Sequence, residues 1–127
     1  MKIDHIAMYV YDLENMKQFF IDYFDAKPND LYHNSKTGLQ TYILSFSNGA
    51  KLELMNHPDM VNISQSIYKN GYIHISFSLG SKNAVDELTD RLRKQGYEVL
   101  SGPRITGDGY YESGIVGPEG NLLELTV

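Results

Sequence analysis

The sequence contains no cysteine, which excludes disulfide bonds, thiolate metal sites and cysteine nucleophiles. No run of about 18 or more apolar residues occurs, so we expect no membrane-spanning helix. Positive charge is scarce: 11 Lys and Arg stand against 16 Asp and Glu, and the net charge of −5 argues against nucleic acid or an anionic membrane as a partner. The lack of cysteine and of an apolar signal region at the start of the sequence predicts a cytoplasmic protein.

What the sequence does contain is ordinary for a folded domain. Apolar residues make up 42% and charged residues 21% of the 127 positions, enough to bury one core. Apolar spacing predicts a helix over Leu13–Phe24 after the N-cap Asp12, and a second helix from Ser81 or Lys82 to Gln95, ended by Gly96. Alternating patterns predict strands over 2–10, 39–47, 50–56, 72–79, 110–117 and 122–127, with weaker strands at 31–33 and 97–100 and a short helix at 63–68.

Both halves of the chain follow the order strand, helix, three strands. His5 and His74 lie 69 positions apart in matching first strands. Gly49 and Gly120, and likewise Glu53 and Glu124, lie 71 positions apart in matching last segments. The agreement predicts a duplication within a single domain over residues 1–127, with module 1 at about 1–58 and module 2 at about 71–127.

Four side chains of this repeat have the composition of a metal site. In each half, the alternation places the histidine of the first strand and the glutamate of the last strand on the face away from the aliphatic residues. Two imidazoles and two carboxylates suit one divalent ion of Ni, Co, Zn, Mn or Fe. Any one of these residues alone would be an ordinary strand residue, but two carboxylates buried together need a cation. We therefore expect His5, Glu53, His74 and Glu124 to be metal ligands.

Several segments together resemble the vicinal oxygen chelate superfamily, which includes glyoxalase I, bleomycin-resistance proteins, fosfomycin-inactivating enzymes and ring-cleaving dioxygenases. The segments are Asp4-His5-Ile6, Lys51-Leu52-Glu53-Leu54, Ile73-His74-Ile75, Gly107-Asp108-Gly109-Tyr110-Tyr111-Glu112 and Gly117-Pro118-Glu119-Gly120-Asn121-Leu122-Leu123-Glu124-Leu125. The resemblance implies an α+β fold in which two tandem βαβββ modules form a curled mixed sheet around a central cavity. Because positions 53 and 124 both carry glutamate, the candidate ligand set is most similar to that of glyoxalase I.

By that resemblance, the protein is a metal-dependent lyase or isomerase acting on a small α-oxygenated substrate, such as the hemithioacetal of methylglyoxal and a thiol. The ion would stabilise an enediolate, and Glu124 or Glu53 would act as the base. Members that bind glutathione commonly carry an arginine in the first strand, where this chain has Met8 and Tyr9. The identity of the thiol in the substrate therefore stays open. The resemblance also implies a homodimer.

Two alternatives use the same fold. One is an epimerase or thiol transferase with the same ligands. The other is a metal-free protein that binds a drug or another aromatic ligand, with an aromatic lining from Tyr9, Tyr42, Phe46 and Tyr72. For either use, Tyr111 is a candidate pocket residue and Arg104 the candidate partner of an anionic substrate group.

Overall fold

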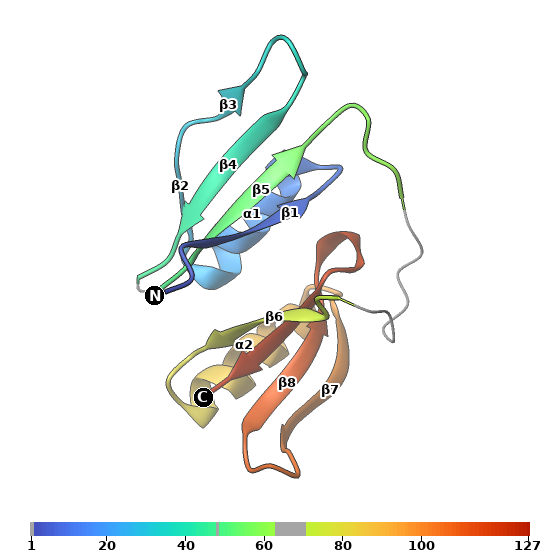
Figure 1. The fold of residues 1–127 in the computed structure, drawn as a ribbon. Helices are drawn as coiled ribbons and strands as arrows, with labels where there is room; N and C mark the ends of the chain where they lie inside the picture. Colours follow the sequence, from blue (N-terminus) through green and yellow to red (C-terminus); the bar gives the residue numbers. More distant parts are fainter. Residues whose placement is uncertain (1, 48, 63–70) are drawn as a thin grey trace. The chain divides into compact units, whose positions relative to one another are not determined.

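The computed structural model describes residues 2–47, 49–62 and 71–127, and the chain divides into two compact units (Figure 1). Unit 1 comprises Met1–Ile63 and unit 2 comprises Ser64–Val127. Neither helix among the described residues has the length and apolar composition needed to cross a bilayer.

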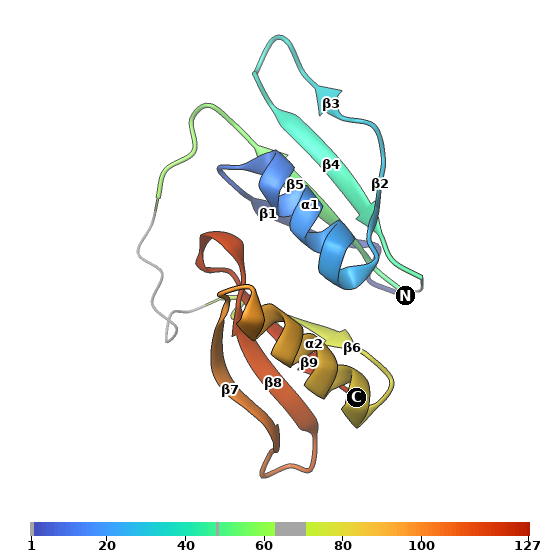
Figure 2. The same cartoon turned by 180° about the vertical axis from the view of Figure 1, so that it is seen from behind.

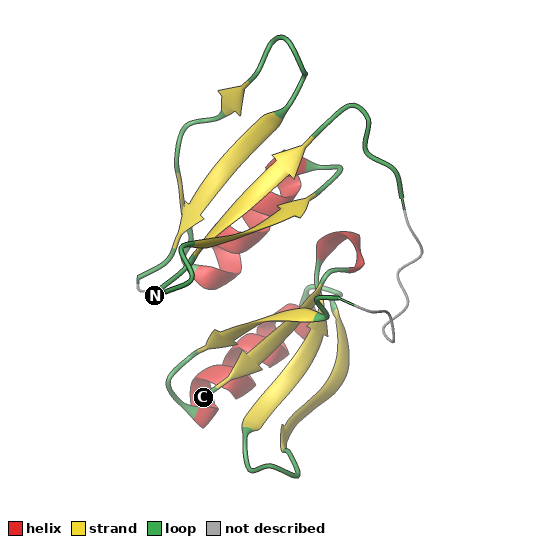
Figure 3. Ribbon diagram, in the orientation of Figure 1, coloured by secondary structure: helices red, strands yellow, loops and turns green. Residues whose placement is uncertain are grey.

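Unit 1 is a mixed sheet with one helix. Its elements are β1 (His5–Tyr9), α1 (Leu13–Phe24), β2 (Lys27–Pro28), β3 (Tyr32–His33), β4 (Gln40–Ser45) and β5 (Lys51–Asn56). The strand order is β1-β5-β4-β2, with β3 pairing β4, and β1 runs parallel to β5 (Figure 3). The parallel β1–β5 pair puts the first and last strands of the unit side by side.

Unit 2 repeats this plan. Its elements are β6 (His74–Ser78), α2 (Lys82–Lys94), β7 (Glu98–Ile105), β8 (Tyr111–Val116), the short 3-10 helix η1 (Pro118–Gly120) and β9 (Leu122–Thr126). The strand order is β6-β9-β8-β7, and β6 runs parallel to β9. Ala7 pairs with Glu53 and Ser76 pairs with Glu124, so the two parallel pairs have equivalent registers. These findings confirm the predicted α+β fold of paired modules.

The helix boundaries follow from capping. Asp12 accepts a hydrogen bond from the backbone N–H of Asn15 at 2.9 Å and so begins α1 as expected. Ser81 accepts from the N–H of Ala84 at 3.2 Å at the start of α2. Gly96, with a φ of 92°, follows the end of α2 in the left-handed conformation that glycine adopts without steric cost.

Each helix covers one face of its own sheet (Figure 2). Leu52 and Leu54 in unit 1, and Leu123 and Leu125 in unit 2, are buried. The glutamates at positions 53 and 124 point to the opposite side of each strand, because neighbouring strand residues alternate between the faces. The two open sheet faces, meaning those not covered by α1 and α2, therefore carry the candidate glutamate ligands.

Two details differ from the expectations. The strand predicted at residues 97–100 is the eight-residue β7, which passes Gly102-Pro103 because it is an edge strand with irregular register at that point. Lys27–Pro28, where no strand was expected, pairs with β4 as the short β2. The predicted short helix at 63–68 lies outside the described residues.

Candidate functional site

In unit 1, His5 and Glu53 lie close together on the open face. They come from the neighbouring parallel strands β1 and β5, with Glu53 paired to Ala7, two residues beyond His5. The His5 Nε2 to Glu53 Oε2 distance is 3.9 Å. The Glu53 side chain is 22% exposed, so this carboxylate is partly withdrawn from solvent.

The other ring nitrogen of His5 is occupied. His5 Nδ1 lies 3.0 Å from Asp4 Oδ2, and Lys51 Nζ lies 3.3 Å from the same oxygen. Hydrogen bonds from His5 and Lys51 hold the pKa of Asp4 below its usual value. Because an ionised carboxylate only accepts hydrogen bonds, this contact favours the His5 tautomer with the proton on Nδ1, which leaves Nε2 available to a ligand.

In unit 2, His74 on β6 and Glu124 on β9 form the matching pair. The His74 Nε2 to Glu124 Oε2 distance is 3.5 Å, and the Glu124 side chain is 21% exposed. The hydroxyl of Ser76 donates to Glu124 Oε1 at 2.7 Å. This bond orients the carboxylate and leaves Oε2 directed toward the histidine.

A further carboxylate, Glu112, lies beside Glu124 and was not among the predicted site residues. Glu112 is on β8, where it pairs with Thr126 of β9 and with Arg104 of β7. Burial, and then the neighbouring Glu124, raise the pKa of Glu112, while Arg104 opposes the rise. The sequence holds a signal for it, since strand alternation puts Glu112 on the same face as Gly114, which pairs with Glu124.

The geometry of each pair fits shared coordination of one ion. Protein nitrogen and oxygen ligands lie about 2.1 Å from Zn²⁺, so two ligands of one ion are at most about 4.2 Å apart. The observed 3.9 Å and 3.5 Å both fall within that limit. Each unit brings two donors together, and within the described ranges no three His, Asp or Glu side chains form a cluster able to hold a metal. The four-ligand site therefore stays a prediction.

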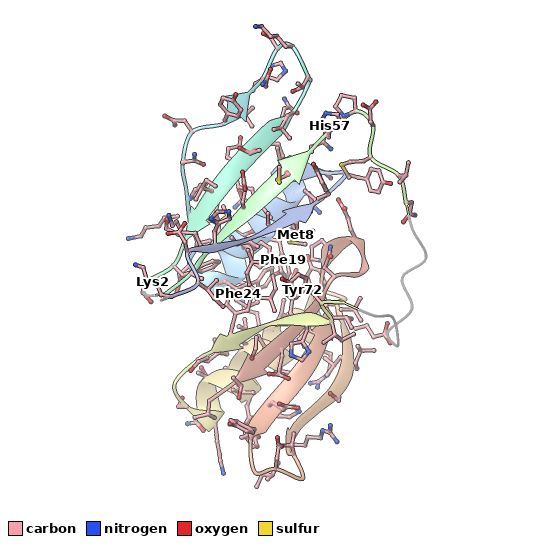
Figure 4. All side chains as sticks on the ribbon, in the orientation of Figure 1. Lys2, Met8, Phe19, Phe24, His57 and Tyr72 are labelled. Atoms are coloured by element: carbon pink, nitrogen blue, oxygen red, sulfur yellow. The ribbon has the colours of Figure 1, made fainter. Side chains whose placement is uncertain are left out.

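The predicted substrate contacts divide into two groups. Tyr9 and Tyr72 follow the same alternation as His5 and His74 and are exposed, Tyr72 at 91%. Figure 4 labels Tyr72 just before β6. Arg104 is exposed on β7 beside Glu112. These three residues keep their predicted assignment.

Two of the other three aromatic residues, Tyr42 and Tyr111, lie on the helix side, so we withdraw them from the site. Tyr42 is 7% exposed, and its hydroxyl donates to Glu14 of α1 at 2.6 Å. The hydroxyl of Tyr111 donates to Asp86 of α2 at 2.6 Å. Composition identified Tyr42 and Tyr111 as aromatic, but strand parity assigns them to the core side. Phe46 follows the last residue of β4 and is half-buried, so alternation does not place it, and its assignment stays a prediction.

Two residues near the site have structural contacts. The Asn56 side chain donates to the backbone carbonyls of Val10 and Tyr11 at 2.9 and 3.2 Å, which joins the end of β5 to the β1–α1 connection. His57, labelled beyond β5 in Figure 4, accepts at Nδ1 from the N–H of Asp59 at 3.1 Å. Neither residue belongs to the His–Glu pairs.

Comparisons with known proteins agree with this architecture. The model of the Glyoxalase/Bleomycin resistance protein/Dioxygenase superfamily matches residues 2–125. A search of curated proteins finds no match. Among solved structures, a glyoxylase/bleomycin resistance protein/dioxygenase domain from Frankia sp. EAN1pec has 19% identity and a TM-score of 0.83, covering 100% of this chain and 97% of its own.

Two further structures have more specific descriptions. The trypanothione-dependent glyoxalase I of Leishmania major has 19% identity and a TM-score of 0.78, covering 99% of this chain and 86% of its own. The fosfomycin resistance protein FosX of Listeria monocytogenes, complexed with Mn(II) and sulfate, has 20% identity and a TM-score of 0.71, covering 98% and 90%. At these identities, the likeness establishes the fold.

Proposed function

Since the chain belongs to the Glyoxalase/Bleomycin resistance protein/Dioxygenase superfamily, we propose that it is a metal-dependent, glyoxalase-like lyase or isomerase. Its substrate is a small α-oxygenated compound, such as the hemithioacetal of methylglyoxal with a thiol. One observation carries the proposal: each unit holds a histidine and a glutamate at equivalent strand positions, with N–O distances of 3.9 and 3.5 Å on a face that its own helix leaves open.

His5, Glu53, His74 and Glu124 would hold one divalent ion of Ni, Co, Zn, Mn or Fe. When bound, the ion supplies Lewis-acid polarisation of the substrate oxygens. Glu53 or Glu124 takes a proton from the carbon next to the substrate carbonyl and returns it to the neighbouring carbon. Such a transfer needs a carboxylate partly withdrawn from solvent, and both glutamates meet this condition at 22% and 21% exposure.

Tyr9, Tyr72 and Arg104 are the proposed substrate contacts. The two tyrosines share the alternation of the proposed ligands, and Arg104 lies next to Glu112 at the edge of the unit 2 sheet. An exposed guanidinium at this edge offers paired donors to a carboxylate on the substrate. We also propose that the protein is a cytoplasmic homodimer, which sedimentation analysis and cell fractionation would check.

The experiment combines metal analysis with a turnover screen. Protein purified without chelator is expected to contain one divalent ion per chain, and Glu53→Gln combined with His74→Ala is expected to lose it. The matched control is His33→Ala combined with Glu98→Gln, which makes the same changes at exposed positions on β3 and β7. The screen tests each ion with methylglyoxal and glutathione, bacillithiol or other thiols.

The outcomes separate the candidate functions. Ion-dependent turnover that is lost in the double variant and kept in the control supports the proposal. Ion-dependent epimerisation or thiol addition without lyase activity would support the epimerase or transferase alternative. A metal-free protein that binds aromatic ligands equally well in both variants would contradict the proposal and support sequestration.

A further inference from the structure

In each unit, a neighbouring side chain contacts one residue of the His–Glu pair. That residue is the histidine in unit 1 and the glutamate in unit 2. In unit 1 the histidine has a partner: Asp4 lies 3.0 Å from His5 Nδ1. In unit 2 the equivalent position before the histidine is Ile73, and no described residue accepts a hydrogen bond from His74 Nδ1. The first histidine is therefore oriented by a carboxylate and the second is not.

For the glutamates the relation is reversed. Ser76 pairs with Glu124 across β6 and β9, and its hydroxyl donates to the carboxylate at 2.7 Å. At the equivalent place in unit 1 Ala7 pairs with Glu53 and has no hydroxyl. Among the side chains that the structure describes, none donates a hydrogen bond to Glu53, and the His5 Nε2 atom lies 3.9 Å from its carboxylate.

We propose that Asp4 and Ser76 are positioning residues that make His5 and Glu124 the more firmly held donors of their His–Glu pairs. This inference rests on the proposed function, because it ranks the four proposed ligands. Every contact that it uses lies within one unit.

Asp4 is itself held in place at two points. Its backbone carbonyl accepts from the N–H of Lys51 at 2.8 Å, and its side chain lies 3.3 Å from Lys51 Nζ. A carboxylate anchored in this way selects the tautomer with the proton on Nδ1 of His5 and points Nε2 toward Glu53. In unit 2 the positions equivalent to Asp4 and Lys51 are Ile73 and Leu122, so His74 lacks this support.

The hydrogen bond from Ser76 restricts Glu124 in a corresponding way. To change its orientation, Glu124 must give up this bond, whereas Glu53 has no such bond to lose.

The first test measures Ni²⁺ affinity by competition with a chromogenic chelator, using the full chain stripped of metal. Ser76→Ala is expected to raise the Kd about 10- to 100-fold, the usual loss when a partner of a metal ligand is removed. Ser78→Ala is the matched control, because Ser78 lies two residues along the same face of β6 and makes no hydrogen bond to either glutamate. Ser76→Thr keeps a hydroxyl and is expected to restore the affinity.

The glutamates provide the second comparison. Glu124→Gln is expected to raise the Kd more than Glu53→Gln, because the oriented ligand contributes more to affinity. An equal or larger loss in Glu53→Gln, or a Ser76→Ala variant that binds like wild type, would overturn the inference. Wild-type protein that binds no Ni²⁺, Zn²⁺ or Mn²⁺ would instead overturn the proposed function itself.

The role of Asp4 has a readout that needs no metal. Imidazole ¹⁵N chemical shifts of the metal-free protein, recorded at a pH where the ring is neutral, are expected to show His5 with its proton on Nδ1. Asp4→Asn is expected to shift His5 toward the Nε2–H tautomer and leave His74 unchanged, while Asp30→Asn in an exposed loop changes neither. Identical His5 spectra in wild type and Asp4→Asn would overturn this part of the inference.

Discussion

The two units have the same strand order and different cores. Under the unit 1 sheet, α1 contributes an aromatic cluster in which Phe19 lies 5.4 Å from Phe20 and 5.2 Å from Tyr23, measured between ring centroids. Under the unit 2 sheet, α2 contributes the buried Val85, Thr89 and Leu92. The fold thus tolerates either aromatic or aliphatic filling as long as the apolar alternation of the strands is kept.

The units also differ in how a polar strand residue meets its helix. Tyr42 pairs with Leu54 in unit 1, and Ser113 pairs with Leu125 at the equivalent place in unit 2. Tyr42 contacts the charged pair Glu14 and Lys17, and its ring lies 4.3 Å from Lys17 Nζ. Ser113 instead bonds the hydroxyl of Thr89 at 2.6 Å, and both residues are completely buried. The polar contact in unit 1 is charged and reaches the surface, whereas the one in unit 2 is neutral and enclosed.

The largest effect is expected in the aromatic cluster. Phe20 is 1% exposed and its ring lies 5.5 Å from that of Phe24. Phe20→Ala removes this packing and should lower the free energy of unfolding by about 3–5 kcal/mol, whereas Leu92→Ala in unit 2 should cost about 2–5 kcal/mol. Urea denaturation followed by circular dichroism measures both.

Tyr32→Ala, at a position 52% exposed, is the control and should change stability by less than about 0.5 kcal/mol. A Phe20→Ala variant as stable as this control would contradict the assignment of the unit 1 core.

A smaller effect is expected at the enclosed hydroxyl pair. Thr89 Oγ1 donates to the carbonyl of Val85 at 2.6 Å, so Ser113 must donate to Thr89. Thr89→Val leaves the Ser113 hydroxyl buried without an acceptor and should cost about 1–3 kcal/mol. Adding Ser113→Ala removes the hydroxyl donor that has no acceptor, so the double variant should be more stable than Thr89→Val alone. Additive losses in this double-mutant cycle would show that the two hydroxyls do not interact.

The smallest effect concerns pH, and it distinguishes the charged contact from the neutral one. Hydrogen bonds from Lys17 and Tyr42 hold the pKa of Glu14 below its usual value. A lowered carboxyl pKa stabilises the fold above the usual glutamate value, and this stability is lost as the pH falls through the lowered value. Glu14→Gln should therefore weaken the decline of stability in acid, only slightly because the Glu14 side chain is 63% exposed.

The measurement is the urea midpoint between pH 7 and pH 3. Ser113→Ala is the control, because the Ser113–Thr89 pair does not titrate in this range and its pH profile should parallel that of wild type. A Glu14→Gln profile parallel to that of wild type would show that the contact with Lys17 and Tyr42 is not coupled to protonation.

Much of the fold could be predicted because helix capping and strand alternation depend on residues close together in the sequence. Aspartate and serine are common N-cap residues, and Asp12 and Ser81 cap the two helices. Strand alternation placed Glu53 and Glu124 on the face opposite the leucines. The equivalent registers of the two parallel strand pairs match the spacing of the histidines and glutamates in the sequence. These signals depend on residues close in sequence or on a repeated period.

The remaining features depend on contacts between distant segments. Tyr42 was assigned to the site for its aromatic ring, although its parity with Leu44 places it against Glu14 of α1. The approach of Glu112 to Glu124, and of Ser76 to the same carboxylate, arises from strand pairing that one sequence does not reveal. Assigning parity before residue type would have excluded Tyr42, whereas Glu112 could be identified only once the pairing of β8 with β9 was known.

X-ray absorption spectroscopy at the Ni edge, on protein reconstituted with one ion per chain, would show whether the two His–Glu pairs bind the same ion. We expect a shell of nitrogen and oxygen ligands at about 2.0–2.2 Å, with scattering from two imidazoles. His5→Ala and His74→Ala should each reduce it to one imidazole. A spectrum with two imidazoles in His74→Ala, or with none in wild type, would contradict a single ion shared by the His–Glu pairs of both units.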